Sequence, residues 1–292
     1  MNLLDTTNIT KEYIDFIFGD ALLFSDHRMR NNFKDILNGF ILCNCFFEPS
    51  TRTSLSFESA MKKLGGEVIT FNGQTSSLLK GESDLDTLKT LEQYSDIIVL
   101  RHSSKKLLYD YSKKCNIPII NGGNGGSEHP TQALLDLYTI KKYFFPESCK
   151  NYNLIKVLFV GDIKHSRTIH SLENLLKLYD NIVINYFPYP YCDRESDINI
   201  NSFDNISDYD VVYMTRLQKE RFDKELNMDI KKYILTKNEV NTMKETSIIL
   251  HPLPRNEELD SSVDYCKQAK YFEQMKNGLY VRQAILNYHL NQ

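Results

Sequence analysis

The sequence predicts two α/β domains, each a doubly wound parallel β-sheet, and three observations support this fold class. Apolar runs of strand length alternate with stretches that repeat apolar residues at helical spacing. This alternation occurs twice, before and after a break at residues 146–153. The length of 292 residues also suggests two domains of ordinary size.

Composition narrows the possible partners. The chain is 41% apolar and 25% charged, as is usual for globular proteins, and its net charge of −3 does not indicate a nucleic-acid partner. No apolar run approaches the roughly 20 residues that span a bilayer, and the first residues resemble no export or transit signal. The six cysteines follow no disulfide or zinc-site spacing. We therefore expect reduced thiols and a cytoplasmic location, with neither nucleic acid nor membrane as a partner.

The elements of the first half alternate in a regular order. Amphipathic helices are predicted at residues 9–25 and 28–38, and a buried strand at 40–47. The remaining elements, in order, are a helix that ends at Gly65-Gly66, a strand at 67–71, a helix at 83–94, strands at 95–102 and 117–120, and a helix from Pro130.

The second half repeats the alternation. Strands are predicted at residues 157–162, 182–187, 211–216 and 248–250, with a helix after the first of them. Residues 188–208 are irregular, and a final helix covers residues 277–290.

A hydroxyl-rich turn follows the strand at residues 40–47. It reads Ser50-Thr51-Arg52-Thr53 and opens the next helix. The first N–H groups of a helix have no partner inside it, and the helix dipole favours an anion there. Because hydroxyls and the planar guanidinium of Arg52 suit phosphate, we interpret the turn as a phosphate site. The alternative is an ordinary N-cap with a surface arginine; the turn is not a P-loop.

Other polar residues follow the ends of predicted strands. Arg101 ends one strand, His129 and Gln132 lie at a strand-to-helix turn, and Arg216 ends a strand of the second half. In open α/β sheets, ligands bind beyond the carboxyl ends of the strands. We therefore expect these side chains to face ligands, although an isolated histidine is often structural.

Five motifs in a fixed order resemble the aspartate/ornithine carbamoyltransferase family, in its aspartate-using branch. They are Ser50–Thr53, His129–Gln132, Gly161–Leu172, Met214–Arg221 and His251–Pro254. The resemblance spans nearly the whole chain. It implies a carbamoyl-phosphate-binding domain of residues 1–134 plus 277–292, with the C-terminal helix packing back on it, and an aspartate-binding domain of residues 135–276.

The resemblance also implies roles for single residues in carbamoyl phosphate binding. The phosphate would be held by Ser50, Thr51, Arg52 and Thr53. The carbonyl oxygen would accept from Thr53, Arg101 and His129. The carbamoyl NH₂ would donate to Gln132 and to the backbone carbonyls of Leu253 and Pro254. The catalytic groups would be Arg52, Thr53, Lys80, Arg101 and His129.

The aspartate carboxylates would be bound by Arg167, Arg216, Gln218 and Lys80. Ser76 and Lys80, on a polar loop beside Gly81, would come from a neighbouring subunit of a homotrimer. Ion pairs of Glu48, Glu220 and Arg221 would steady a closed state. Neither a cofactor nor a metal is implied, and a regulatory chain is left open as a partner. His165 and Ser166 stand where the family carries Tyr and Gly, which could alter aspartate affinity.

Three alternatives compete with this interpretation. An ornithine enzyme typically carries Cys in the motifs that here read His129–Gln132 and His251–Pro254. An inactive homologue acting as a scaffold would have lost phosphate-binding residues, and all of them are present. A nicotinamide-dependent dehydrogenase would need the G-x-G-x-x-G fingerprint, which is missing.

Overall fold

The computed structural model divides into two compact units, which are described separately. It describes residues 2–73, 81–145, 153–192, 194, 199–200, 202–216, 218 and 231–291. The first unit is Met1–Tyr138 with Lys276–Gln292, and the second unit is Thr139–Met275. The sequence placed the corresponding domain boundaries after residue 134 and before residue 277. No helix in the described ranges is long and apolar enough to cross a membrane.

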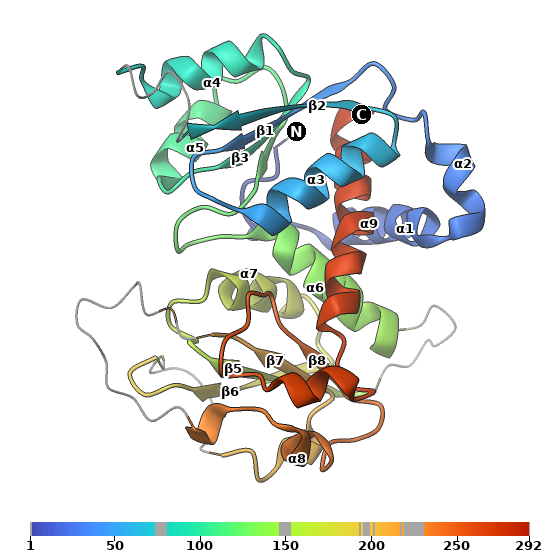
Figure 1. The fold of residues 1–292 in the computed structure, drawn as a ribbon, viewed down its shortest axis with the longest axis vertical. Coiled ribbons are helices and arrows are strands. Elements are labelled where there is room, and N and C mark those ends of the chain that lie inside the picture. The colour runs from blue at the N-terminus through green and yellow to red at the C-terminus, as the bar shows by residue number, and fades with distance from the viewer. Residues whose placement is uncertain are drawn as a thin grey trace. The chain divides into compact units, whose positions relative to one another are not determined.

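The first unit contains a four-stranded parallel sheet in the order β2-β1-β3-β4 (Figure 1). Its strands are β1 (Ile41–Phe46), β2 (Glu67–Asn72), β3 (Ile97–Arg101) and β4 (Ile119–Asn121). Its helices are α1 (Lys11–Ser25), η1 (His27–Met29), α2 (Arg30–Phe33), α3 (Thr51–Lys63), α4 (Asp84–Glu92) and α5 (Lys105–Ser112). The unit boundaries fall inside α6 (Pro130–Phe144) and α9 (Tyr271–Leu290).

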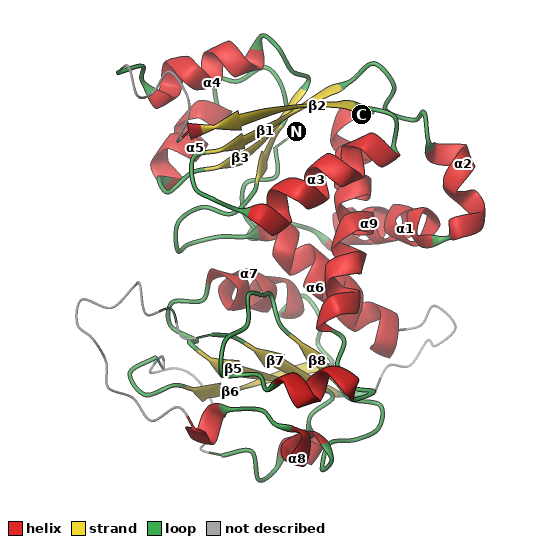
Figure 2. Cartoon of the chain, viewed as in Figure 1, coloured by secondary structure: helices red, strands yellow, loops and turns green. Residues whose placement is uncertain are grey.

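The second unit contains a parallel sheet of the same kind, in the order β6-β5-β7-β8 (Figure 2). Its strands are β5 (Ile155–Gly161), β6 (Ile182–Pro188), β7 (Val211–Met214) and β8 (Ile248–Leu250). Its further helices are α7 (Arg167–Leu176), η4 (Ile206–Asp208), η6 (Lys231–Tyr233), α8 (Lys237–Val240) and η7 (Ser261–Tyr265).

Both sheets reverse the direction of winding between their two central strands. From β1 the chain moves outward to β2 and then returns to β3 on the other side of β1. The second sheet does the same with β5, β6 and β7. Such switch points leave a crevice beyond the carboxyl ends of the central strands. The predicted fold class is therefore confirmed, including the C-terminal helix, whose residues from Lys276 belong to the first unit.

Several element boundaries differ from the prediction. Helix α5 was not predicted, although its N-cap Ser104 accepts a hydrogen bond from the Leu107 N–H. The helix expected at 28–38 is only a 3₁₀ turn followed by the four residues of α2. Helix α9 begins at Tyr271 rather than near residue 277. Its first turns include the polar, buried Gln274, which interrupts the apolar pattern.

Helices α4 and α5 cover one face of the first sheet. Buried Leu88 of α4 and Leu108 of α5 pack with Cys43 and Cys45 of β1. Alternate residues of a strand point to the same face, so the side chains of Cys43 and Cys45 both enter this core. Both cysteines are free thiols. Burial raises the pKa of Cys45. The described cysteines are free, and Cys43, Cys45 and Cys192 are buried.

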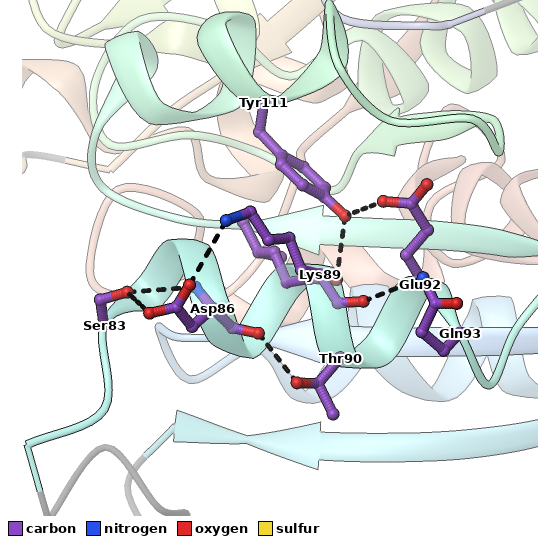
Figure 3. A network of polar contacts seen from close by, with 8 residues as sticks. Ser83, Asp86, Lys89, Thr90, Glu92, Gln93 and Tyr111 are labelled. Carbon is purple, nitrogen blue, oxygen red and sulfur yellow. Dashed lines mark hydrogen bonds and ion pairs between the residues drawn. The ribbon is translucent and has the colours of Figure 1, made fainter.

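Polar contacts fix both ends of α4 (Figure 3). At the start, the Ser83 hydroxyl accepts from the Asp86 N–H at 3.1 Å and donates to the Asp86 carboxylate at 2.8 Å. At the other end, the Tyr111 hydroxyl of α5 contacts the Leu88 carbonyl and the Glu92 carboxylate. Helix α4 thus has an ordinary side-chain cap. Helices α3 and α7 differ from it, because their N-cap residues make no such hydrogen bond.

Candidate active site

Helix α3 begins at the first switch point without a side-chain cap. Its N-cap residue Ser50 has extended backbone, but its hydroxyl makes no capping hydrogen bond. The N-cap side chains of α1, α4 and α5 (Thr10, Ser83 and Ser104) all accept one. The Ser50 hydroxyl is therefore not used in the way that the N-cap interpretation requires.

The first turn of α3 is held against the sheet by a buried amide. Asn44 lies in the middle of the apolar strand β1, and its Nδ2 donates to the Ser54 carbonyl at 3.2 Å. The Thr53 side chain is buried beneath this turn, while Thr51 and Arg52 are exposed. Strand β1 thus fixes where the exposed groups of the turn point, a role for Asn44 that the apolar pattern of the strand concealed.

Arg101 and Arg52 bring two positive charges to this edge of the sheet. Arg101 is the last residue of β3 and pairs in register with Phe46, the last residue of β1. Burial lowers the pKa of Arg101; Glu48 opposes that shift, while Arg52 adds to it. Nε of Arg101 lies 3.4 Å from Oε2 of Glu48. With two guanidiniums beside one carboxylate, the edge is well suited to an anion.

His129 lies in the segment that follows β4, directly before α6, and is 5% exposed. Gly122 ties this segment to the sheet, because its N–H donates to the Leu100 carbonyl at 2.9 Å. A Cβ on Gly123 would approach the His129 ring to 3.1 Å, and the φ of Gly123 is +104°. Glycine is therefore required for the ring to lie against this backbone.

Gln132 is the first of three polar side chains in the first unit that interact in series, followed by Asp136 and Arg282. Its Nε2 donates to Oδ1 of Asp136 at 2.8 Å, so its amide oxygen is directed away from Asp136 and can accept from a ligand. Complete burial lowers the pKa of Arg282 on α9 to about 10, while Asp136 acts in the opposite direction. The Arg282 guanidinium also lies 5.2 Å from the ring centre of Phe57 on α3. This series of interactions links α6, α9 and α3.

The second switch point has a close approach between its two central strands. The φ of Gly161, the last residue of β5, is +119°, and a Cβ there would lie 2.2 Å from the Thr215 carbonyl oxygen. The Thr215 N–H in turn donates to the Val160 carbonyl at 2.8 Å. Only glycine allows this contact, which places Arg216 directly beyond the end of β5.

Asp162, the residue after β5, organises the loops around it. It is fully buried, and its Oδ2 accepts from the Gln218 N–H at 3.3 Å. Its Oδ1 accepts from the His165 N–H at 3.1 Å and lies 2.9 Å from the His165 Nδ1. Both oxygens therefore accept hydrogen bonds from inside the protein, and through Oδ2 Asp162 positions the backbone of Gln218.

Helix α7 starts beside these groups and, like α3, lacks a side-chain cap. Ser166 is its N-cap residue, and its hydroxyl contacts the Thr168 hydroxyl at 3.0 Å instead of capping the helix. Arg167 is the first helical residue and is partly exposed. The positive end of the helix dipole thus adds to the charges of Arg167 and Arg216 on this edge.

Buried side chains shape the turn after β8. Nδ1 of His251 accepts from the Leu253 N–H at 2.8 Å, so Nε2 carries the proton shared with Glu258 at 2.9 Å. Burial alone would raise the pKa of Glu258, but hydrogen bonds from His251 and Asn256 bring it below its ordinary value. Leu253 has φ of +53°. Such backbone strain in a non-glycine residue is typical of functional sites.

The structure thus groups the predicted residues into two sets. The first unit carries, in segments that follow the carboxyl ends of its strands or at those ends, Ser50, Thr51, Arg52, Thr53, Arg101, His129 and Gln132. The second unit carries Arg167, Arg216, Gln218, Leu253 and Pro254 at the carboxyl ends of its strands. The predictions for Ser76, Lys80, Glu220 and Arg221 lie outside the described residues. Sequence reasoning missed the supporting residues Asn44, Asp136, Asp162 and Arg282.

The two sets offer complementary chemistry. The first unit offers hydroxyls, N–H groups and guanidiniums, which suit a phosphate or another oxyanion. It also offers an imidazole and an amide oxygen, which suit a polar group attached to such an anion. In the second unit, two arginines and a glutamine suit carboxylates, since a guanidinium matches a carboxylate in bidentate geometry.

Comparisons with known proteins cover both units. The sequence model of the aspartate/ornithine carbamoyltransferase carbamoyl-P binding domain matches residues 1–142, and that of the Asp/Orn binding domain matches residues 153–289. A relative from Methanococcus vannielii, an aspartate carbamoyltransferase catalytic subunit, is 45% identical over 270 residues, covering 87% of this chain and 86% of the relative.

Solved structures agree with these sequence matches. The catalytic subunit of M. jannaschii aspartate transcarbamoylase superposes with a TM-score of 0.88 at 40% identity, covering 99% of this chain and 98% of that chain. An aspartate transcarbamoylase from Trypanosoma cruzi, solved with carbamoyl phosphate and aspartate, gives a TM-score of 0.88 at 30% identity, with 99% and 95% coverage.

Proposed function

The chain belongs to the aspartate/ornithine carbamoyltransferase family, and from this premise we propose that it transfers the carbamoyl group of carbamoyl phosphate to the amino group of L-aspartate. The products are N-carbamoyl-L-aspartate and phosphate, in an early step of de novo pyrimidine biosynthesis. The observation that carries the proposal is the pair of guanidiniums, Arg52 and Arg101, beside the uncapped start of α3.

The residue types fit the charge changes of this reaction. As the amine attacks, negative charge grows on the carbonyl oxygen, where Thr53, Arg101 and His129 act as donors. A preorganised donor of this kind typically contributes about 10²–10³ in rate. Phosphate then departs, and the charges of Arg52 and Lys80 offset its own. The amine attacks in its neutral form, so exclusion of water from the site assists the reaction.

The polar groups of the second unit favour aspartate over ornithine. Arg167 and Arg216 supply two cations for the two carboxylates, with Gln218 held beside them through its N–H. The ammonium group of ornithine would need an available carboxylate instead. The buried carboxylate of Asp162 already accepts hydrogen bonds at both oxygens from His165 and Gln218.

The proposal is tested with purified protein, carbamoyl phosphate, and either aspartate or ornithine, by identifying the carbamoylated product. Carbamoyl aspartate should form and citrulline should not. Formation of citrulline would assign the chain to the ornithine branch. If neither product formed in protein that still binds carbamoyl phosphate, the chain would be an inactive relative.

Arg216→Ala should raise the KM for aspartate by about 10- to 100-fold, because it leaves a substrate carboxylate without a charged hydrogen-bond partner. It should also reduce kcat. Binding of carbamoyl phosphate alone, measured by calorimetry, should change little. An equally steep loss of carbamoyl phosphate affinity would contradict the division of roles between the two sets of residues.

We further propose a homotrimer in which Ser76 and Lys80 complete the site of the adjacent chain. Support comes from the family resemblance and from charge: two carboxylates and a phosphate gain from a further cation. Head-to-tail contacts around a three-fold axis would close such a ring. A regulatory chain could add to this assembly. A cytoplasmic location is also proposed, because the described cysteines are free thiols.

Mixing of subunits tests the shared site. Lys80→Ala and Arg52→Ala chains, each inactive alone, are combined, dissociated and reassembled. In random trimers about a quarter of the sites pair an intact Arg52 with an intact Lys80, so about a quarter of the wild-type activity should return. If mixed trimers confirmed by mass spectrometry remain inactive, each chain completes its own site.

A further inference from the structure

The second unit contains a cluster of three side chains of metal-binding type, none of which contacts a substrate in the proposed reaction. Asp162, His165 and Cys192 each offer one ligand atom, and these three atoms lie within 4.8 Å of one another. Two of the residues come from the turn after β5 and the third from the loop after β6. We propose that this cluster is a binding site for a thiophilic divalent metal ion of the Zn²⁺ class.

The donor set is the first argument for this class of metal. Thiolate, imidazole and carboxylate are the three side-chain groups that bind zinc, whereas Mg²⁺ and Ca²⁺ prefer oxygen ligands alone. In a tetrahedral zinc site, donor atoms lie about 3.3–3.6 Å apart. Shifts of about 1 Å would therefore bring the atoms to bonding positions around one ion. Three protein ligands leave a fourth position for water.

The backbone around the cluster is the second argument. The Lys164 N–H donates to the Cys192 carbonyl at 2.8 Å, and the Tyr189 N–H donates to the Gly161 carbonyl at 2.8 Å. The two loops that carry the ligands are thus joined directly on both sides of the cluster. A bound ion would find them already placed, so little ordering cost would oppose its binding.

Burial and charge are the third argument. Asp162 and Cys192 are fully buried, while the side chain of His165 is 25% exposed. The carboxylate and a thiolate together would offset the two positive charges of the ion, and His165 would bind in its neutral form. No net charge would then be buried. The partly exposed imidazole leaves a route by which an ion can enter.

Hydrogen bonds already present would support the ion. Oδ1 of Asp162 would bind the metal through one lone pair and continue to accept from the His165 N–H through the other. Oδ2 would continue to accept from the Gln218 N–H. Metal binding at Nδ1 of His165 would replace the hydrogen bond between that nitrogen and Asp162, and the single proton of the neutral ring would lie on Nε2.

Cobalt spectroscopy tests the proposal on the full-length protein, because Co²⁺ takes zinc sites and a cobalt–thiolate bond absorbs in the near ultraviolet. After treatment with a chelator, one equivalent of Co²⁺ should produce this band together with visible bands of tetrahedral intensity. Zn²⁺ should abolish them and should raise the Tm of the wild-type protein. The absence of a thiolate band would overturn the proposal.

Variants assign the ligands. Cys192→Ser and His165→Asn should each lose the band and the Zn²⁺-dependent rise in Tm. The matched controls, Cys266→Ser and His27→Asn, should keep both. Circular dichroism verifies that each variant is folded. If the buried Cys192→Ser variant does not fold, the spectrum of His165→Asn tests the ligand assignment. A band that survives in folded His165→Asn would also overturn the assignment. None of these readouts depends on carbamoyl transfer, so the two proposals fail separately.

Discussion

Arg52→Ala should lower kcat by about three orders of magnitude, with a much smaller change in carbamoyl phosphate affinity. The negative charge on the departing phosphate grows along the reaction, so Arg52 should bind the transition state more tightly than the substrate. Arg101 lies close enough for its pKa to respond to Arg52. It would continue to attract the substrate in the variant, which explains the modest expected loss in binding.

Steady-state kinetics with both substrates measures the loss in kcat, and calorimetry with carbamoyl phosphate measures the loss in affinity. Arg52→Lys should recover only part of the rate, because lysine restores the charge but not the planar fork. Arg28→Ala is the matched control, since Arg28 is an exposed arginine of the same unit paired with Asp26. A kcat of Arg52→Ala within a few-fold of wild type would remove Arg52 from the mechanism.

Asp136→Asn should destabilise the protein by about 3–5 kcal/mol, the usual cost of leaving a buried charge uncompensated. Arg282 is buried on α9, and the negative charge of Asp136 favours its charged form. The substitution removes that charge and alters the hydrogen bond that fixes Gln132. Urea denaturation at a fixed protein concentration measures the free energy of unfolding, with exposed Asp86→Asn as the control.

A double-mutant cycle identifies the cause of the loss. Arg282→Met removes the buried cation, so adding Asp136→Asn to it should cost much less than Asp136→Asn costs alone. If the effects of the two substitutions simply add, the charges do not interact, and the loss has another origin. Activity of the stable variants reports separately on Gln132, because a mispositioned amide oxygen would reduce kcat without reducing stability.

The sequence indicates the residues proposed to face ligands more readily than the groups that support them. Ser50, Arg52, Arg101 and Arg216 stand at boundaries between strand and helix patterns, and those boundaries are local signals. In both sheets the switch points bring such boundaries to one edge. The positions of these residues therefore follow from the order of the elements.

The supporting residues depend on contacts between distant parts of the chain. Arg282 contacts Thr131 across 151 positions, and no local pattern announces such a pair. Cys192 lies in a stretch without periodicity, so its proximity to His165 appears only once the strands are paired. Helix α5 is different, because Ser104 followed by Leu107, Leu108 and Tyr111 is a recognisable start signal that could have been used.

The two units are completed at different times during synthesis, because the chain leaves the first unit after Tyr138 and returns to it at Lys276. The second unit is continuous, from Thr139 to Met275, whereas the first is completed by Lys276–Gln292. Domains generally fold as units during synthesis, N-terminal parts first. Here the inserted unit emerges whole while its N-terminal neighbour still lacks Arg282 and the rest of α9. Nascent chains should thus expose the part of α6 that contacts Arg282 until residues 276–292 have emerged.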